Sequence, residues 1–538
     1  MCGIAAVIGR GGAQSIHSML QAIHARGPDD SATTFVGDQA ALGIQRLSIV
    51  GVESGAQPFV RRSRLHFVCN GELYNYQTLH SAYSKMHSAP RSDVEAILDV
   101  YEQQGMASLP LLDGIFSFVL YDAVKGTFLA ARDRFGVKPL YYIQDDDRWY
   151  FASEVKALMQ TPGNVKDVRQ VPAGGFVNPA GVGLYHCDIP RPMSAHQPAV
   201  LFALLEGAVQ NQMQADSGIP IGVFLSGGLD SSVIAALAAR SRPDIVAFTI
   251  GMEGSPDVIA AREVASYIGI HLVECCFNPM DVEEGIYEAV RITESYNTMI
   301  VAEGLMTMLL AKAARRHGIK VVLCGEGADE LFAGYGLFRG LGCEEFQETR
   351  RAMLANIGNT ECRRLDRATM SYSVEARVPF LDSRVVDWAM GLPKSSLHQE
   401  DQGETTDKFI LREAFSDLLP PRIANRRKVS FDDGSGILAH LEQFRAPLNN
   451  ALWTREKGWA VANVKDEVAC YLFRVWRSIY GDAGGADVFQ LFGEYPIMQS
   501  VLTEQRLTSG GTGEDAVNLA LLDRFHVTRD TVPLTITA

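Results

Sequence analysis

The segment IGVFLSGGLDSSVIAALAA, residues 221–239, constrains the fold of this chain more than any other stretch. An apolar strand runs into a turn rich in glycine and serine, and the turn opens directly into a helix. Further strands and helices alternate after it, which is typical of a parallel, doubly wound α/β sheet. The segment therefore predicts that the middle of the chain is built around such a sheet.

The elements expected around this segment alternate along the chain. We expect helices at 199–214, 233–241, 260–269 and 302–318, and strands at 221–225, 245–251, 271–277 and 320–327. We expect residues 345–500 to be mostly helical.

The first part of the chain has a different pattern. Residues 1–188 hold short strands of alternating apolar residues with Gly and Asp between them, which predicts an antiparallel, sheet-rich domain with one helix at 93–104. Three prolines in 190–198 indicate a linker. The sequence therefore predicts three parts, which are a domain at 1–190, a second domain at 199–500 and a tail at 501–538.

Composition limits the classes of function. A chain of 538 residues is too long for one core, and its formal net charge of −14 argues against a general nucleic-acid binder. Its 9 cysteines lack CxxC spacing, which favours a reducing compartment over a zinc or disulfide scaffold. No leader pattern or apolar run long enough for a bilayer is visible, so we expect a cytoplasmic protein without a membrane partner.

The turn after the strand at 221–225 has the composition of a phosphate site. Its backbone N–H groups and the hydroxyls of Ser226, Ser231 and Ser232 can surround phosphate oxygens at the positive end of a helix. It lacks the Gly-Lys-Ser/Thr ending of a Walker A loop, and Asp230 suits a magnesium ion carried by a nucleotide. A tight turn would explain the glycines but not the serines and the aspartate together.

The chain begins MCGIAAVIG. If the initiator methionine is removed, Cys2 carries both a thiol and a free α-amine, which can act as the base that activates the thiol. A small apolar residue that opens a buried strand would explain an isolated Cys2 equally well.

Several separate motifs decide between these interpretations. The 226–232 loop resembles the pyrophosphate-binding loop of ATP pyrophosphatases, and together with MCGI it resembles the glutamine-hydrolysing asparagine synthetases (class B) and their relatives. The resemblance covers about residues 1–435. It is carried by RLSIV (46–50), GAQPF (55–59), NGELYN (70–75), SDVE (92–95), RDRFGVKPLYY (132–142), FASEVKAL (151–158), SGGLDSS (226–232), CGEGADELFAGY (324–335) and VEARVPFLD (374–382).

The resemblance implies a fold and a reaction. The fold would be an αββα N-terminal-nucleophile glutaminase domain followed by an ATP-pyrophosphatase domain. The reaction would take ammonia from glutamine through a tunnel near 190–198 to a carboxylate activated by ATP and Mg²⁺. A homodimer is a further expectation.

The resemblance also implies the roles of single residues in glutamine hydrolysis. Cys2 would be the nucleophile, and Asn70 and the N–H of Gly71 would hold the oxyanion. Arg46 would hold the α-carboxylate of glutamine, and Glu72 and Asp93 would accept its α-ammonium.

In the second half, the implied residues bind ATP or act on the acyl-adenylate. Glu326 would accept protons from the attacking ammonia, and Lys428 would neutralise phosphate charge, with Arg426 and Arg427 as neighbouring alternatives. Asp230 and Asp329 would steady magnesium. The residues expected at ATP and pyrophosphate are Leu225, Ser226, Gly227, Gly228, Asp230, Ser231, Ser232, Ile250, Cys324 and Gly325.

The sequence departs from the family where the acceptor is expected. The Thr-Thr-Ile-Arg element of asparagine synthetases is replaced at 298–303 by TMIVAE, which puts Val301 in place of the arginine and an acid at Glu303. Ser371-Tyr372-Ser373-Val374 replaces Ala-Trp-Gly-Val. Loss of the arginine should weaken aspartate binding, so we expect a specialised carboxylate as acceptor.

Other interpretations stay open. Aspartate remains the alternative acceptor, with Arg291 or Arg377 supplying the cation while Val301 and Glu303 only pack and solvate a helix. A glutaminase alone would leave SGGLDSS and CGEGADE unexplained, and an amidotransferase acting on a sugar phosphate would have a different fold in the second half. A non-enzymatic descendant should have lost Cys2, Asn70 or Asp230, and all three are present.

Overall fold

The structure is a computed structural model. It describes residues 2–11, 13–84, 90–186, 194–252, 254–401, 404–429, 431–445, 467–485 and 488–493. Residues 1–494 form one compact unit. The predicted tail at 501–538 and part of the predicted linker, 190–193, lie outside the described residues.

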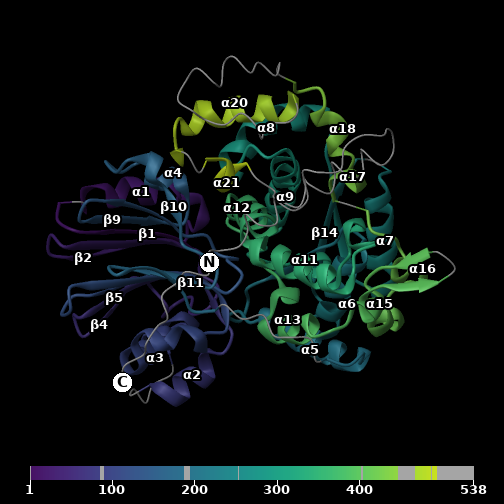
Figure 1. The fold of residues 1–538 in the computed structure, drawn as a ribbon, viewed down its shortest axis with the longest axis horizontal. Helices are drawn as coiled ribbons and strands as arrows, with labels where there is room; N and C mark the ends of the chain where they lie inside the picture. Colours follow the sequence, from purple (N-terminus) through teal and green to yellow (C-terminus); the bar gives the residue numbers. More distant parts are fainter. Residues whose placement is uncertain are drawn as a thin grey trace. The chain divides into compact units, whose positions relative to one another are not determined.

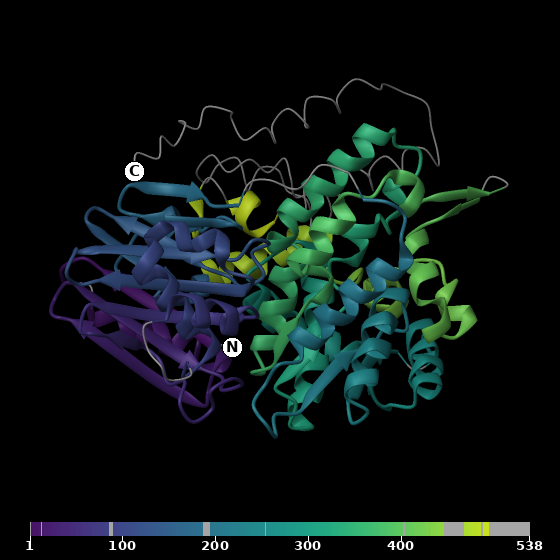
Figure 2. The ribbon, with the colours of Figure 1, turned by 90° about the horizontal axis from the view of Figure 1, so that it is seen from below.

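Two antiparallel sheets dominate the first 184 residues, as the period-two pattern predicts. The first sheet has the order β10-β8-β9-β1-β3-β2 and the second β12-β11-β7-β6-β5-β4 (Figures 1 and 2). The bounds in the first sheet are Arg169–Gln170, Tyr141–Asp145, Arg148–Ala152, Cys2–Ile8, Ala40–Arg46 and Asp30–Val36. In the second they are Gly181–Leu184, Gly175–Asn178, Thr127–Arg132, Gly114–Asp122, Leu65–Leu73 and Phe59–Arg61.

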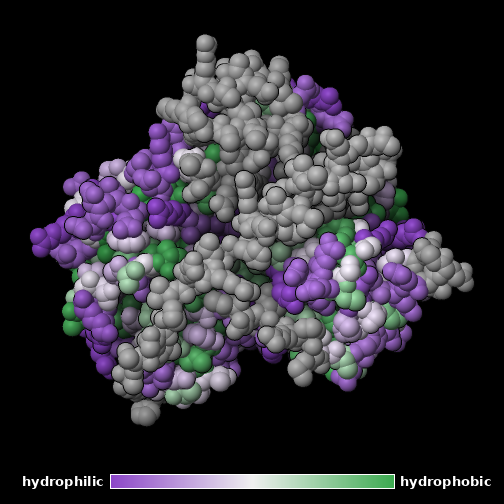
Figure 3. Space-filling model, in the orientation of Figure 1, coloured by the Kyte–Doolittle hydropathy of each residue, from purple (hydrophilic) through white to green (hydrophobic). Residues whose placement is uncertain are grey.

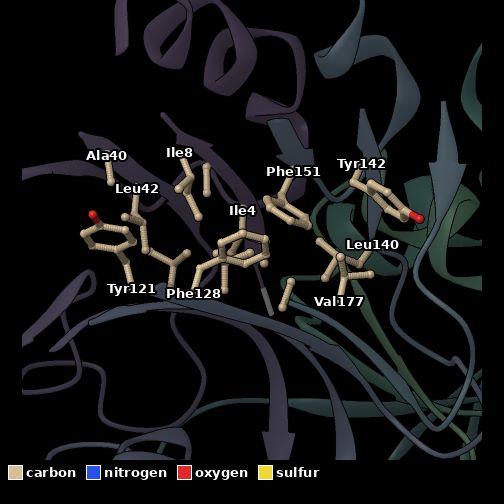
Figure 4. Packing of buried hydrophobic residues seen from close by; sticks show 14 of the residues in the cluster. Ile4, Ile8, Ala40, Leu42, Tyr121, Phe128, Leu140, Tyr142, Phe151 and Val177 are labelled. Carbon is tan, nitrogen blue, oxygen red and sulfur yellow. The ribbon is translucent and has the colours of Figure 1, made fainter. Parts of the chain in front are cut away.

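The two sheets bury one apolar layer between them. Alternate residues of β1, namely Cys2, Ile4, Ala6 and Ile8, point into this layer. Figure 4 shows Ile4, Leu42 and Phe151 of the first sheet facing Phe128 and Val177 of the second. Because side chains alternate along a strand, this layer fixes which face of β1 carries the Cys2 side chain.

Helices cover the outer faces of both sheets. Helix α1 (Ile16–Ala22) packs on β1 and β3, and α3 (Ala96–Gln104) joins α2 (Tyr76–Tyr83) on the second sheet. The resulting αββα sandwich confirms the fold expected for this part. The expectation of a single helix was too low, because α1, α2 and α4 (Val155–Leu158) are helical as well, and the helix expected to begin at residue 93 opens with a 3₁₀ turn at Asp93–Glu95.

The sheet that follows is parallel and has five strands among the described residues. Its order is β15-β14-β13-β16-β17, with bounds His271–Cys276, Val246–Gly251, Ile221–Phe224, Val321–Leu323 and Glu375–Arg377. Helices expected from the alternation are present as α5 (Pro198–Gln212), α6 (Leu229–Ser241), α7 (Pro256–Ile268) and α9 (Thr298–Arg316). The doubly wound prediction is confirmed, and the carboxyl ends of β13, β14 and β16 meet at one edge, where ligands bind such sheets.

The remaining elements complete this part. Helix α8 spans Pro279–Thr293 and α10 spans Ala328–Phe332; α11 to α18 are Cys343–Asn356, Glu361–Met370, Ser383–Met390, Lys394–Leu397, Phe409–Phe415, Pro421–Ala424, Phe431–Ser435 and Ile437–Leu441. They are followed by α20 (Glu467–Tyr480) and α21 (Val488–Phe492). The prediction that 345–500 is mostly helical omitted three short strands, β17, β18 (Gln399–Asp401) and β19 (Glu404–Thr406).

Hydrophilic and hydrophobic residues are mixed on the face of the molecule that Figure 3 shows. In Figure 3 the coloured residues are largely hydrophilic, with hydrophobic groups scattered among them. Among the described residues, no helix has the length and apolar content that crossing a membrane requires.

Candidate active sites

Cys2 is the first residue of β1 and is held at both ends of its backbone. Its N–H donates to Oδ1 of Asn70 at 3.0 Å, and its carbonyl accepts from Nε of Arg26 at 3.1 Å. Burial raises the pKa of the Cys2 thiol, so a base is needed before sulfur can attack. Cys2 does open a buried strand, and these contacts also fix its orientation.

Asn70 and Gly71 lie side by side on β5. Asn70 is fully buried, and its Nδ2 has no hydrogen-bond partner among the residues that the structure describes. A buried amide donor without a partner is costly and is suited to an oxygen that arrives with a ligand. A Cβ at position 71 would collide with the carbonyl of Ile115, so only glycine fits there.

The three residues expected to bind glutamine are all buried close to this region. Arg46 lies opposite Cys2 in the β1–β3 pairing, and its guanidinium donates to the carbonyls of Gly51 at 2.5 Å and Val52 at 3.2 Å. Oδ2 of Asp93 accepts from the N–H of Leu73 at 2.7 Å, which joins it to the end of β5.

Glu72 has a partner that the sequence did not suggest. Its Oε1 lies 3.2 Å from Nη2 of Arg377, on strand β17 of the parallel sheet. Burial, followed by the charge of Asp93, raises the pKa of Glu72 well above its usual range.

Arg26 is a residue that the sequence reasoning missed. Besides Cys2, its guanidinium contacts Glu154 at 2.7 Å and Asp366 at 2.8 Å. The next residue is Gly27, where a Cβ would collide with the carbonyl of Gln45, so the backbone at Arg26 passes directly against β3. The local signal was the Arg-Gly-Pro sequence at 26–28.

The loop at 226–232 connects β13 to α6 as predicted and is closed by its own hydroxyls. Ser231 Oγ lies 3.1 Å from Ser226 Oγ and 3.2 Å from the N–H of Ser226, and Ser232 Oγ donates to the carbonyl of Gly228 at 2.6 Å. Gly227 has φ +71°, and a Cβ there would lie 2.5 Å from the backbone N of Ala261 in α7. The turn therefore requires glycine at that position.

Lys408 joins the two carboxylates expected at magnesium. Its Nζ lies 2.6 Å from Asp230 and 2.5 Å from Asp329, and Lys428 Nζ lies 2.6 Å from the other oxygen of Asp329. Lys408 adopts φ +52°, an uncommon value for a residue with a side chain. The sequence did not single out Lys408, because a lone lysine carries no motif.

The charges of this cluster act on one another. Burial alone would raise the pKa of Asp329, but Lys408 and Lys428 outweigh burial and lower that pKa to about 2. Burial raises the pKa of Asp230, which shares Lys408 with Asp329. The carboxylate oxygens of these two aspartates are donors of the kind that Mg²⁺ takes alongside phosphate oxygens and water, so the residues present fit that ion.

The remaining nucleotide candidates lie at the same edge of the sheet. Leu225 and Ile250 are buried at the ends of β13 and β14, and the N–H of Cys324 donates to the carbonyl of Arg377 at 2.9 Å. A Cβ at Gly325 would lie 3.0 Å from the backbone N of Ser231. The 324–327 segment therefore lies directly against the 226–232 loop.

Glu326 belongs to a group of acids around one arginine. Arg364, on α12, lies 2.8 Å from Glu303, 3.3 Å from Glu326 and 3.0 Å from Glu361. Arg364 was missed by the sequence reasoning. The side chain of Glu303 pairs with this buried guanidinium and is only 13% exposed, so it packs inside the protein.

Three further residues were candidates for binding the acceptor, and none of them contacts Arg364 through an ion pair in the described part of the chain. Val301 is fully buried in α9. Arg291 pairs with Glu288, and Arg377 pairs with Glu375 and Glu72. Both arginines that the sequence offered as substitute cations therefore already have carboxylate partners.

Family models match both parts of the chain. The model described as "Glutamine amidotransferase domain" matches residues 1–182, and the model described as "Asparagine synthase" matches residues 201–353 and 341–459. A protein of Triphysaria versicolor named "Asparagine synthetase [glutamine-hydrolyzing]" is 34% identical over 481 residues, which cover 82% of this chain and 80% of that protein. The chain belongs to the asparagine synthetase family.

Other members have similar identity. "Asparagine synthetase B [glutamine-hydrolyzing]" of Escherichia coli (strain K12) is 36% identical over 438 residues, covering 76% of this chain and 77% of that protein. The corresponding Asparagus officinalis protein is 35% identical over 468 residues, covering 81% and 78%. These findings confirm the predicted family, and at the level of that family they confirm an ATP-dependent ligase with a glutamine amidotransferase domain.

Proposed function

We propose that this member of the asparagine synthetase family hydrolyses glutamine and uses the ammonia to convert an ATP-activated carboxylate into an amide. The products would be the amide, glutamate, AMP and pyrophosphate. The observation that carries the proposal is that one compact unit holds both Cys2 bound to Asn70 and the Asp230–Lys408–Asp329 cluster. We keep as part of the proposal the division into a glutaminase domain at 1–190 and a synthetase domain at 199–500.

Glutamine hydrolysis would begin at Cys2. The α-amine, free after removal of the methionine, takes the thiol proton, and sulfur attacks the side-chain carbonyl carbon of glutamine. Nδ2 of Asn70 and the N–H of Gly71 donate to the resulting oxyanion. The proton returns to the leaving nitrogen as ammonia departs, and water then cleaves the thioester to glutamate.

Arg46, Glu72 and Asp93 would orient the substrate. The guanidinium of Arg46 would donate to the glutamine α-carboxylate, and the carboxyl oxygens of Glu72 and Asp93 would accept from the α-ammonium. Because Glu72 already pairs with Arg377 at 3.2 Å, its share in this binding would be the weaker of the two.

Adenylation would take place at the 226–232 loop. A carboxylate oxygen of the acceptor attacks the α-phosphorus of ATP, and pyrophosphate leaves. The loop N–H groups and the hydroxyls of Ser226, Ser231 and Ser232 would hold the departing phosphates, while Lys408 and Lys428 balance their charge. Asp230 and Asp329 would hold Mg²⁺, which when bound lowers the effective charge of the pyrophosphate.

Ammonia would complete the reaction at Glu326. Neutral ammonia attacks the acyl carbon, Glu326 accepts a proton, and AMP leaves with the bonding electrons. Ammonia must arrive unprotonated because ammonium has no lone pair, and a dry passage favours the neutral form. The tunnel expected near 190–198 involves residues of which 190–193 lie outside the described part of the chain.

We further propose that the acceptor is a carboxylic acid other than aspartate. Arg364 is the cation nearest Glu326, and it already contacts Glu303 and Glu361 besides Glu326. A second carboxylate on the acceptor, such as the α-carboxylate of aspartate, would add a negative group where three acids already surround one guanidinium. An acceptor with an amine or hydroxyl beside the activated carboxylate suits these surroundings better.

Aspartate is the second candidate, and the names of the relatives favour it. The α-ammonium of aspartate could pair with the same acids that repel its α-carboxylate. The experiment for the common part of the proposal supplies amide-¹⁵N glutamine, ATP, magnesium and mixed carboxylic acids. We expect AMP, pyrophosphate and a ¹⁵N amide; release of ADP and phosphate instead would contradict adenylation.

A further inference from the structure

The guanidinium of Arg26 links the backbone of Cys2 to two buried carboxylates. Nε donates to the Cys2 carbonyl at 3.1 Å, Nη1 contacts Glu154 at 2.7 Å, and Nη2 lies 2.8 Å from Oδ2 of Asp366. The side chains of Arg26 and Asp366 are each only 2% exposed. Water therefore screens this ion pair little, and each partner depends on the other for its charge balance.

Asp366 comes from the synthetase part of the chain. Asp366 lies on α12. Arg26 comes just after α1, the helix that packs on the first sheet of the sandwich. The other oxygen of Asp366 lies 3.5 Å from Nζ of Lys138, which also comes from the N-terminal part. Both cations that Asp366 contacts thus belong to the part of the chain that carries Cys2.

We propose that Asp366 is a positioning residue of the glutaminase site, an inference that rests on the proposed function. The Cys2 backbone is fixed at its nitrogen by Asn70 and at its carbonyl by Arg26. Asp366 and Glu154 hold the guanidinium from two directions. Without the Asp366 charge, the guanidinium turns toward Glu154, and the Cys2 carbonyl and the attached thiol shift relative to Asn70.

Helix α12 therefore serves both chemical centres. Two residues before Asp366 it carries Arg364, which contacts Glu326 at 3.3 Å. The glutaminase site is incomplete without a carboxylate that the synthetase part supplies.

The test compares two variants of the full-length chain. Asp366→Asn keeps the shape of the side chain but removes its charge. The matched control is Asp387→Asn, which removes the partner of Arg134 in another ion pair between the same two parts, 2.5 Å long and with Asp387 45% exposed. Steady-state glutamine hydrolysis and the rate at which iodoacetamide alkylates Cys2 are measured for both.

We expect Asp366→Asn to lower kcat for glutamine hydrolysis by about 10- to 100-fold with little change in KM, as small displacements of a reacting group do. Cys2 alkylation should slow in parallel, while Asp387→Asn behaves like the wild type. Asp366→Glu restores the charge on a longer side chain and should recover part of kcat. If Asp366→Asn does not fold, the comparison of Asp366→Glu with the wild type still measures the effect of moving this charge.

Three results would overturn the inference: wild-type kcat in Asp366→Asn, an equal loss in Asp387→Asn, or no difference between the Glu and Asn variants at position 366. A wild-type chain that does not hydrolyse glutamine at all would contradict the proposed function instead, so the two failures are distinguishable.

Discussion

The Oε2 atom of Glu303 lies 2.8 Å from Nε of Arg364, beside the carboxylate of Glu326. This ion pair sets an acid of the chain itself against a buried guanidinium. Because Arg364 also contacts Glu361, three acidic side chains share this one guanidinium. Under the proposed function, an acceptor with a second carboxylate would meet these acids rather than a free cation.

Glu303→Gln should change the choice of acceptor. The amide keeps the size of the side chain but removes one negative charge, so Arg364 becomes available to an anionic group. We expect kcat/KM for dicarboxylic acceptors, aspartate included, to rise about tenfold or more relative to the wild type, a gain of about 1.4 kcal/mol. The assay is AMP release with each acid, and Glu344→Gln, at an exposed position of α11, is the control. An unchanged ratio of acceptors would show that Glu303 does not select them.

Cys2→Ala should remove glutamine-dependent activity but not the second half of the reaction. Because the thiol is the proposed nucleophile, glutamate release should fall to background, whereas ammonium salts at alkaline pH should still support AMP formation. Cys69→Ala removes another buried thiol of the same sandwich and serves as the matched control. Intact-mass analysis checks the premise, since a fully active enzyme that retains Met1 would rule out the α-amine as base.

Lys408→Met should separate the two activities in the opposite way. The variant leaves Asp230 and Asp329 without their shared cation, and breaking such a buried pair costs about 3–5 kcal/mol. We expect AMP formation to fall by at least about 100-fold while glutamate release stays close to wild type. Lys125→Met, at an exposed turn, controls for loss of a positive charge. Equal losses of both activities would indicate a folding defect instead.

The αββα layers were expected from the family resemblance, whereas the strands and the 226–232 loop were expected from local sequence patterns. Strands β1, β3, β5 and β6 follow from short apolar runs with Gly and Asp between them, and the 226–232 loop follows from glycine between a strand and a helix. These features are local, so a short window contains the whole signal.

The residues that were missed depend on contacts between distant segments. Arg364, Asp366 and Lys408 are single charged residues without a repeated spacing, and such residues are usually solvated. Their importance comes from burial against acids and bases far away in the chain, such as Glu326, Arg26 and Asp230. Strand β17 was missed because three residues are too few for a periodic pattern.

We expect Glu330 to give the stability of the enzyme a specific pH dependence. Burial, together with Glu361 and Asp329, raises the pKa of Glu330 to about 8, so the folded protein holds a proton that the unfolded chain releases near its ordinary pKa. Stability from this group is complete at low pH and is lost as the pH rises between these two values. Glu330→Gln has no such proton, so we expect its melting temperature relative to wild type to increase from pH 5 to pH 8. Between pH 5 and pH 8, the free energy of unfolding of the variant relative to wild type can change by at most about 4 kcal/mol. A constant difference across that range would contradict the raised pKa.

The proposed acceptor class is tested by comparing aspartate with other carboxylic acids. Purified enzyme with amide-¹⁵N glutamine, ATP and magnesium is given aspartate or one of a panel of carboxylic acids that carry an amine or hydroxyl, and AMP and the ¹⁵N amide are measured together. We expect coupled AMP and amide formation with a member of the panel, and turnover of aspartate slower by about 100-fold or more, as expected when a buried carboxylate lacks a cation. Conversion of aspartate to ¹⁵N asparagine at an ordinary enzymatic rate would contradict the proposed acceptor class.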